Sequence, residues 1–260
     1  MSDHLLVERQ GDIATLVLNK PKSHNAISID MYRDLPGLVA DLDGDPQVKV
    51  VVVRGAGQKA FASGADISEF EQERGNATAA RNYNEHVAAA ERALEGMAKP
   101  TIAMIHGYCI GGGAGLALAC DLRFADPRAR FAITPSKLGL VYSLESTKRV
   151  VDLAGPSRAK WILMSGQQIE AERALQLGLF DEIHPTEELE SATYAFAEVI
   201  TTRAQFAVRS GKAMVNRVVR GQVADDEETT GIRNSSFDTE DYAEGVRAFL
   251  EKRAPRFSWR

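Results

Sequence analysis

IHGYCIGGGAGLALACD, residues 105–121, is the stretch that decides the fold. It starts at the end of an apolar segment, turns into the glycines Gly111, Gly112 and Gly113, and continues as a run of Ala and Leu. Glycine loses more backbone entropy on folding than any other residue, so three in a row indicate positive φ or a close approach to a ligand. We therefore expect a strand, a tight turn and a helix of small residues.

The N-terminus of that helix is a candidate binding site for an anion. The first backbone N–H groups of a helix have no acceptor within the helix and carry a partial positive charge. Neither of the common phosphate-binding patterns, GxxxxGK[ST] and GxGxxG, fits these glycines. The structural alternative is that small residues let the helix pack closely on a sheet.

The rest of the chain predicts an α/β fold. Apolar, β-branched runs predict buried strands at 13–18, 48–53 and 101–105. Helical patterns between them, at 29–41 and 77–97, favour alternating strands and helices with right-handed crossovers. After Pro156 the patterns are helical, at 171–177, 187–219 and 241–253. We expect a core over residues 1–200 and a C-terminal helical region over 201–260.

Composition narrows the class of partner. The 260 residues include 31 Lys and Arg against 36 Asp and Glu, a net charge of −5, which disfavours nucleic acid and anionic membranes as partners. Only Cys109 and Cys120 are present, without the spacing of a disulfide framework or a metal site, so we predict no metal and a reducing compartment. Because no apolar run reaches the ~18 residues that span a bilayer, we predict a cytoplasmic protein.

A second glycine-containing segment reveals a family resemblance. KAFASGADISEF, residues 59–70, follows the strand-like VVVRG, and KPTIAMIHGYCIGGGAGLALACD comes some forty residues later. This ordered pair resembles the signature of the crotonase (enoyl-CoA hydratase/isomerase) superfamily. LNKPKSHNAIS and the final FLEKR also match, so the resemblance covers about 19–252. It implies a crotonase-like spiral of ββα units with a C-terminal helical trimerisation region, in a homotrimer or homohexamer.

The resemblance also implies an oxyanion hole. In that family two backbone N–H groups, which correspond to Ala65 and Gly112, donate to the thioester oxygen of an acyl-CoA. A thioester enolate places its negative charge on one oxygen, and each preoriented donor in a dry site contributes ~3 kcal/mol to its formation. CoA is part of the substrate, so no separate cofactor is expected.

The carboxylates of the family's hydratases are missing. Their two glutamates correspond to Gly115 and Pro135, and a further acidic position of isomerases and dehalogenases corresponds to Ser143. Gly and Pro side chains cannot transfer protons. Standard hydration is therefore not expected.

TPSKLGLVY, residues 134–142, resembles the methylmalonyl-CoA decarboxylase branch of the superfamily. When CO2 leaves a malonyl-type thioester, the bonding electrons form the enolate directly and no base is needed. We therefore favour decarboxylation, with Tyr142 orienting the carboxylate or assisting protonation. Alternatively, Tyr142 is a core aromatic whose hydroxyl has found a partner.

Two other readings stay open. Glu145 is the nearest substitute carboxylate for hydration or isomerisation, although Ser143 as a helix N-cap would place it in a first turn that stabilises its charge. The other alternative is a non-catalytic acyl-CoA-binding protein, because a fold does not guarantee an activity.

Binding of CoA by an acidic protein requires local cations for its phosphates. Lys22 is the first candidate, and the resemblance adds Phe249 and Lys252 on the last helix, which in the family often completes a neighbouring subunit's pocket. His24 lies in the loop that borders the CoA site in the family, with polar surface as the alternative. The same resemblance assigns further contacts to Ala26, Ser63, Asp66 and Ile67.

Overall fold

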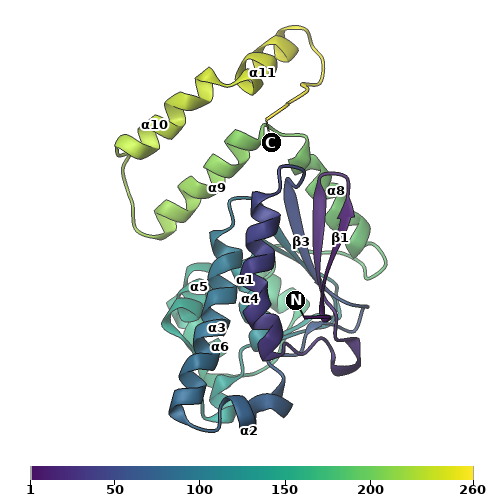
Figure 1. The fold of residues 1–260 in the computed structure, drawn as a ribbon, viewed down its shortest axis with the longest axis vertical. Coiled ribbons are helices and arrows are strands. Elements are labelled where there is room, and N and C mark those ends of the chain that lie inside the picture. The colour runs from purple at the N-terminus through teal and green to yellow at the C-terminus, as the bar shows by residue number, and fades with distance from the viewer. Residues whose placement is uncertain (1, 260) are drawn as a thin grey trace.

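A computed structural model describes residues 2–259 and contains two β-sheets (Figure 1). The larger has six strands in the order β1-β2-β3-β5-β7-β10, and the smaller has four in the order β4-β6-β8-β9. The strands are β1 (Leu5–Gln10), β2 (Ile13–Leu18), β3 (Val50–Gly55), β4 (Ala60–Ala62), β5 (Thr101–Ile105), β6 (Tyr108–Ile110), β7 (Leu122–Ala125), β8 (Arg130–Ala132), β9 (Ile169–Glu170) and β10 (Glu182–Ile183).

The helices follow the strands in the order expected of an α/β chain. They are α1 (Ile29–Gly44), α2 (Phe70–Glu73), α3 (Ala77–Gly96), α4 (Gly112–Ala119), α5 (Leu144–Ala154), α6 (Pro156–Ser165), α7 (Ala171–Gln176), α8 (Leu189–Thr201), α9 (Gln205–Val219), α10 (Glu227–Ser235) and α11 (Glu240–Leu250). Short 3-10 turns cover Pro21–Ser23, Ile67–Glu69, Pro135–Leu138 and Ser236–Asp238.

From β3 to β8, successive strands alternate between the large sheet and the small sheet. β3, β5 and β7 lie in the large sheet, and β4, β6 and β8, which directly follow them, lie in the small one. Helical segments that contain α3, α4 and α5 complete the three turns. The predicted spiral of ββα units is thereby confirmed, while a role of the C-terminal helices in trimerisation stays a prediction.

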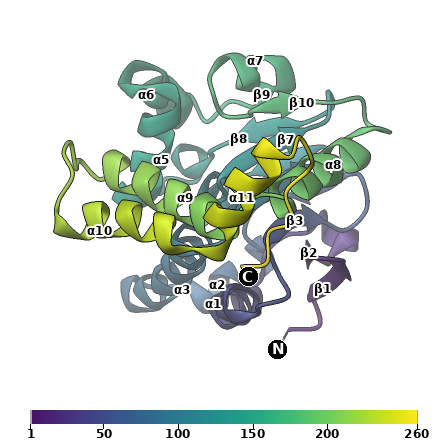
Figure 2. The same ribbon diagram turned by 90° about the horizontal axis from the view of Figure 1, so that it is seen from above.

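The strands β2, β3 and β5 carry continuous apolar runs because other elements pack on both faces of the large sheet. On β3, Val51 and Val53 belong to the main core, whereas Val50 and Val52 pack in a second cluster with Leu189 of α8. α8 contacts β2, β3, β5 and β7 (Figure 2). Strands covered on both faces carry apolar residues at every position, not at alternate ones.

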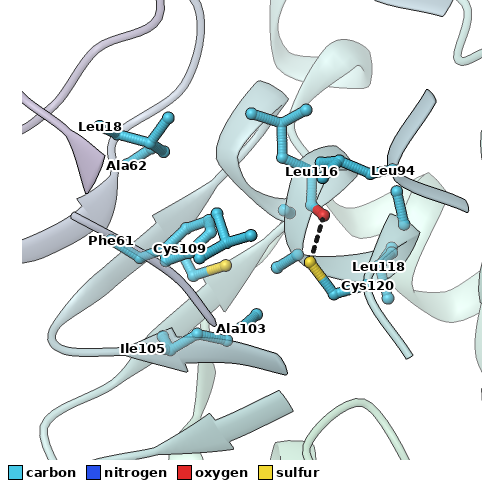
Figure 3. Packing of buried hydrophobic residues seen from close by; sticks show 14 of the residues in the cluster. Leu18, Phe61, Ala62, Leu94, Ala103, Ile105, Cys109, Leu116, Leu118 and Cys120 are labelled. Carbon is cyan, nitrogen blue, oxygen red and sulfur yellow. Dashed lines mark hydrogen bonds between the residues drawn. The ribbon is translucent and has the colours of Figure 1, made fainter. Parts of the chain in front are cut away.

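α4 lies in the middle of the main core. Its residues from Gly113 to Ala119 are all buried, and it contacts α3, α5, β4 and β6. Figure 3 shows the Cys120 thiol donating to the Leu116 carbonyl oxygen at 3.5 Å. Burial raises the pKa of the Cys120 thiol to about 12, and it also raises that of Cys109. Both cysteines are therefore free, protonated core residues.

The C-terminal helical pattern differs from the prediction over residues 187–219. The expected helix over 187–219 is divided into α8 and α9, because the Gln205 side-chain amide donates to the carbonyl oxygens of Ile200 and Arg203, at 2.9 Å each. Lys212 of α9 is anchored to the core by a 2.7 Å ion pair with Asp121. α10 and α11 lie at the end of the molecule opposite to α2 (Figure 1). Among residues 2–259, none of the helices is long and apolar enough to cross a membrane.

Gly107, in the turn between β5 and β6, offers a test of this architecture. Its φ is +57°, and a Cβ placed on it would lie 2.1 Å from the Lys59 carbonyl oxygen. Gly107→Ala should lower the free energy of unfolding by about 1–2 kcal/mol for the left-handed backbone and by a further ~1–3 kcal/mol for the clash.

Gly57→Ala is the matched control, because Gly57 has φ +71° but no atom within 4 Å of its Cβ position. Chemical denaturation of both variants measures the difference. Equal destabilisation of Gly107→Ala and Gly57→Ala would show that the close contact between the β5–β6 turn and Lys59 is not the reason for glycine at position 107.

Candidate active site

Two strand exits of the small sheet meet and leave two peptide N–H groups without acceptors. After β4, the Ile27 N–H donates to the Gly64 oxygen at 2.8 Å and the Asp66 N–H donates to the Ile27 oxygen at 2.9 Å. These bonds do not use the Ala65 N–H. After β6, Gly112 is the first residue of α4, where a helix offers its N–H no acceptor. Within residues 2–259, neither N–H donates a hydrogen bond.

The glycine at position 112 allows these groups to lie close together. A Cβ placed on Gly112 would lie 3.4 Å from the Ala65 nitrogen and only 2.1 Å from the Tyr32 hydroxyl oxygen. Any side chain would therefore have to displace Tyr32. The small residues at both strand exits are explained by this close approach.

Both N–H groups belong to the wall of one cavity of about 260 Å³. The wall also contains Tyr32 from α1, Tyr83 and Glu91 from α3, and Tyr142 from the segment before α5. The cavity therefore combines two peptide donors, three phenol groups and one carboxylate.

Glu91 is a buried carboxylate that fills the space beside Gly115. Glu91 is 3% exposed, and a Cβ placed on Gly115 would lie 2.2 Å from Glu91 Oε1. Gly115 is the position that corresponds to the first glutamate of the family's hydratases. A carboxylate is thus present there, but it comes from α3 and not from α4.

The Glu91 carboxylate is held by one of its two oxygens. Oε2 accepts hydrogen bonds from Ser146 Oγ at 2.7 Å and from Arg149 Nη1 at 2.5 Å. Burial opposes the charge of Arg149, but the carboxylates of Glu91 and Glu95 raise its pKa, so the guanidinium stays cationic. Oε1 accepts no hydrogen bond within the part of the chain that the structure describes, which leaves it free for a substrate.

The tyrosines in the wall have raised pKa values, so their hydroxyl groups stay protonated and are available as donors. Burial raises the pKa of Tyr32, Tyr83 and Tyr142, and the charge of Glu91 raises those of Tyr32 and Tyr142 further. The hydroxyl groups of Tyr83 and Tyr142 are buried without a partner in residues 2–259. Glu91 supplies the one carboxylate of this wall.

Comparison with known proteins identifies the family. The sequence matches the model of the enoyl-CoA hydratase/isomerase family over residues 8–260. The chain belongs to this family. It is 32% identical to a short-chain-enoyl-CoA hydratase of Clostridium acetobutylicum over 96% of each chain, and 34% identical to a crotonyl-CoA hydratase of Syntrophomonas wolfei over 98% of each.

Solved structures of family members share the fold. An enoyl-CoA hydratase/isomerase family protein from Hyphomonas neptunium is 39% identical and superposes with a TM-score of 0.96, covering 99% of this chain and 98% of that one. An enoyl-CoA hydratase/carnithine racemase from Magnetospirillum magneticum is 34% identical with a TM-score of 0.95, covering 99% of this chain and 96% of that one.

Of the residues predicted to be catalytic, the structure brings Ala65, Gly112 and Tyr142 together and leaves Glu145 outside. Glu145 does not line the cavity; its side chain is 54% exposed and pairs with Arg92 at 3.1 Å. Ser143 caps α5 by accepting from the Ser146 N–H at 3.0 Å, which places Glu145 in the first turn. The prediction of Glu145 as a substitute base is not supported, because its helix presents it to solvent.

Glu91 is the functional candidate that the sequence did not reveal. It lies on the buried side of α3, with Ala90 and Leu94 as buried neighbours. A glutamate among apolar residues at helical spacing was the available signal, since buried carboxylates are rare unless they are paired.

The residues predicted to bind CoA divide into two groups. Ser63 and Ile67 line the cavity. The Ser63 N–H donates to the His24 backbone oxygen at 3.0 Å, which holds the loop of residues 22–26 at the edge of the cavity. In this loop Lys22 and His24 are exposed and Ala26 is buried. Asp66 forms an ion pair with Lys20, and the hydrogen bond lowers the Asp66 pKa.

Phe249 and Lys252 form the second group. Phe249 is 83% exposed on α11, Lys252 follows that helix, and neither lines the cavity of its own chain. α11 lies at the end of the molecule away from α2, one of the elements beside the cavity (Figure 1). A contact of these residues with CoA in a neighbouring subunit stays a prediction.

Gly112→Ala tests the pair of peptide donors. The added methyl group displaces the Tyr32 hydroxyl and enters the space beside the Ala65 N–H. We expect turnover of an acyl-CoA substrate to fall by about 10²–10³, the effect of losing one oxyanion donor.

Gly211→Ala in α9, where no atom lies within 4 Å of the Cβ position, is the control. Steady-state kinetics and thermal unfolding of both variants separate loss of the site from loss of the fold. Full activity of folded Gly112→Ala would contradict the assignment of the oxyanion hole.

Proposed function

We propose that this protein catalyses proton transfer next to the thioester of an enoyl-CoA, with Glu91 as acid and base and the Ala65 and Gly112 N–H groups as the oxyanion hole. The observation that carries the proposal is the Glu91 carboxylate beside Gly115, in the same cavity as both N–H groups. The names of two relatives, a short-chain-enoyl-CoA hydratase and a crotonyl-CoA hydratase, support short enoyl-CoA substrates.

Double-bond isomerisation is the reaction that this arrangement supports best. Glu91 Oε1 removes a proton from the carbon next to the thioester of a 3-enoyl-CoA, and the C–H electrons move onto the thioester oxygen. The two N–H groups donate to that oxygen while it carries the enolate charge. When the enolate collapses, its double bond moves toward the thioester and the far carbon takes the proton back from Glu91. One carboxylate suffices, because the proton leaves and returns through the same group.

Hydration uses the same parts with one addition. Glu91 takes a proton from water, the hydroxide oxygen bonds to the β carbon, and the double-bond electrons pass to the thioester oxygen. Glu91 then returns its proton to the α carbon. Pro135, in the place of the second glutamate of the family's hydratases, has no group to orient that water, so hydration is expected to be the slower reaction.

Malonyl-type decarboxylation is the second candidate, and Tyr142 favours it. The Tyr142 hydroxyl is buried without a partner in residues 2–259 and can donate to a substrate carboxylate, in agreement with the TPSKLGLVY resemblance. The electrons of the broken C–C bond would form the enolate without a base. The negative charge of Glu91 in the same wall would repel that substrate carboxylate, so we rank proton transfer first.

Glu91→Gln distinguishes the two chemistries. In D2O the protein should exchange the α protons of butanoyl-CoA, followed by proton NMR, and Glu91→Gln should slow this exchange at least about 10²-fold because the base is lost. Decarboxylation of methylmalonyl-CoA, assayed with the same samples, does not depend on a base.

Glu95→Gln is the matched control, since Glu95 also pairs with Arg149, at 2.6 Å, but does not line the cavity. Its exchange rate should stay within about threefold of the wild type. Methylmalonyl-CoA decarboxylation that survives in Glu91→Gln, with no α exchange in the wild type, would establish the second candidate. Tight binding of all thioesters without any turnover would leave only a binding protein.

We also propose that the chain assembles with copies of itself through its C-terminal helices. Phe249 and Leu250 are 83% and 75% exposed and border a groove between α9 and α11 that Phe206 and Tyr242 also line. Apolar surface of this kind marks an interface, and the family resemblance implies a trimer or a hexamer.

Light scattering after gel filtration should give three or six copies for the wild type. Leu250→Glu should shift the protein toward the monomer, because it places a charge in the groove. Val223→Glu, at a site that is 97% exposed and outside the groove, should not change the mass. A monomeric wild type would refute the assembly.

A further inference from the structure

Arg74 brings a cation into the wall of the cavity without a carboxylate to neutralise it. It directly follows α2, and its Cζ atom lies 4.7 Å from the ring centroid of Phe70 and 4.6 Å from that of Tyr83. Its one side-chain hydrogen bond within residues 2–259 goes from Nη2 to Asn84 Oδ1, at 3.1 Å. In the same range no carboxylate oxygen lies within 4 Å of the guanidinium.

Most carboxylates of the segment around Arg74, residues 66–74, have partners other than Arg74. Three of them have partners of their own: Asp66 with Lys20, Glu73 with Arg33 at 3.6 Å, and Glu69 with the Ile29 N–H at 2.8 Å. A guanidinium has five N–H donors in a planar fork, and one hydrogen bond leaves most of them available. The aromatic contacts hold the plane of this fork in place.

A row of aromatic rings connects the oxyanion hole with Arg74. The Tyr32 hydroxyl lies beside Gly112, the rings of Tyr32 and Tyr83 are 6.0 Å apart edge to face, and the guanidinium lies over Tyr83. Val87 adds an apolar side chain to the same wall. An acyl chain whose thioester oxygen meets the Ala65 and Gly112 N–H groups can therefore place its methylene groups on these rings and its far end at Arg74.

We infer that the acyl group of the substrate ends in a carboxylate, which forms a two-pronged ion pair with Arg74. The substrate class is then a dicarboxylic acid joined to CoA through one of its two carboxyl groups. Guanidinium and carboxylate match in geometry and charge, and an apolar chain end at this place would leave the cation without a counter-ion. The inference rests on the proposed function, which places the thioester at the two N–H groups.

The direct test measures the binding of saturated thioesters, which need no turnover. Calorimetric titration compares butanoyl- to heptanoyl-CoA with succinyl-, glutaryl-, adipoyl- and pimeloyl-CoA, matched in chain length. At the best length, the carboxylate-ended thioester should bind about tenfold more tightly than its methyl-ended counterpart, the effect of charged hydrogen bonds. Arg74→Met should remove this preference, and Arg74→Lys should retain part of it.

Arg81→Met is the control for general electrostatics. Arg81 is an exposed residue of α3 outside the cavity, so this substitution removes the same charge without changing the cavity wall. It should leave the preference unchanged. A wild type without a preference at any length would overturn the inference. So would an Arg74→Met variant that weakens both series equally, since Arg74 would then contact CoA itself.

The proton exchange of butanoyl-CoA keeps the two hypotheses separable. Normal exchange in the wild type and in Arg81→Met, together with loss of the preference in Arg74→Met, would support both the proposed function and the inference. Exchange that is absent from the wild type while the binding preference persists would refute the reaction and leave the carboxylate site standing.

Discussion

Two peptide N–H groups without an acceptor are the constraint on which the rest of this site depends. An unpaired backbone donor in a protein wall costs free energy unless water or a ligand supplies an acceptor, so the surroundings must hold it in place. Here the small sheet does so, because parallel pairing of β4 and β6 brings the Ala65 and Gly112 exits to the same edge. The three-glycine turn and the buried helix α4 follow from the same requirement, since a side chain at position 112 would collide with Tyr32.

Glu91, the proposed acid–base group, shows that a position in space matters more than a position in the chain. Gly115 and Glu91 are complementary, because a Cβ at Gly115 would collide with Glu91 Oε1. A glutamate at position 115 and this conformation of Glu91 therefore exclude each other. α3 and α4 are packed against one another, so a side chain from either helix can reach the same volume. Ser146 and Arg149 of α5 then orient the carboxylate from the opposite side.

Much of the fold was predictable from local sequence. The strand at Ile13–Leu18, the helix at Ala77–Gly96 and the small-residue helix after the glycines all carry strong periodicity or composition, and they lie close to where they were expected. The four short strands β4, β6, β8 and β9 were not predicted, because two or three residues show no periodicity and their pairing partners are distant in sequence. The break before α9 depends on the side chain of Gln205, which a helical pattern does not reveal.

The sequence by itself determined the family and the two peptide donors. Backbone N–H groups do not depend on side-chain identity, and the family resemblance of the segments 59–70 and 105–121 was sufficient to assign these groups to Ala65 and Gly112. Only the tertiary structure decided which side chains face those donors. It replaced the exposed Glu145 by the buried Glu91 and brought Arg74 to the same cavity, because burial and distance arise from the packing of α3 on α4 and of the α2 segment on α3.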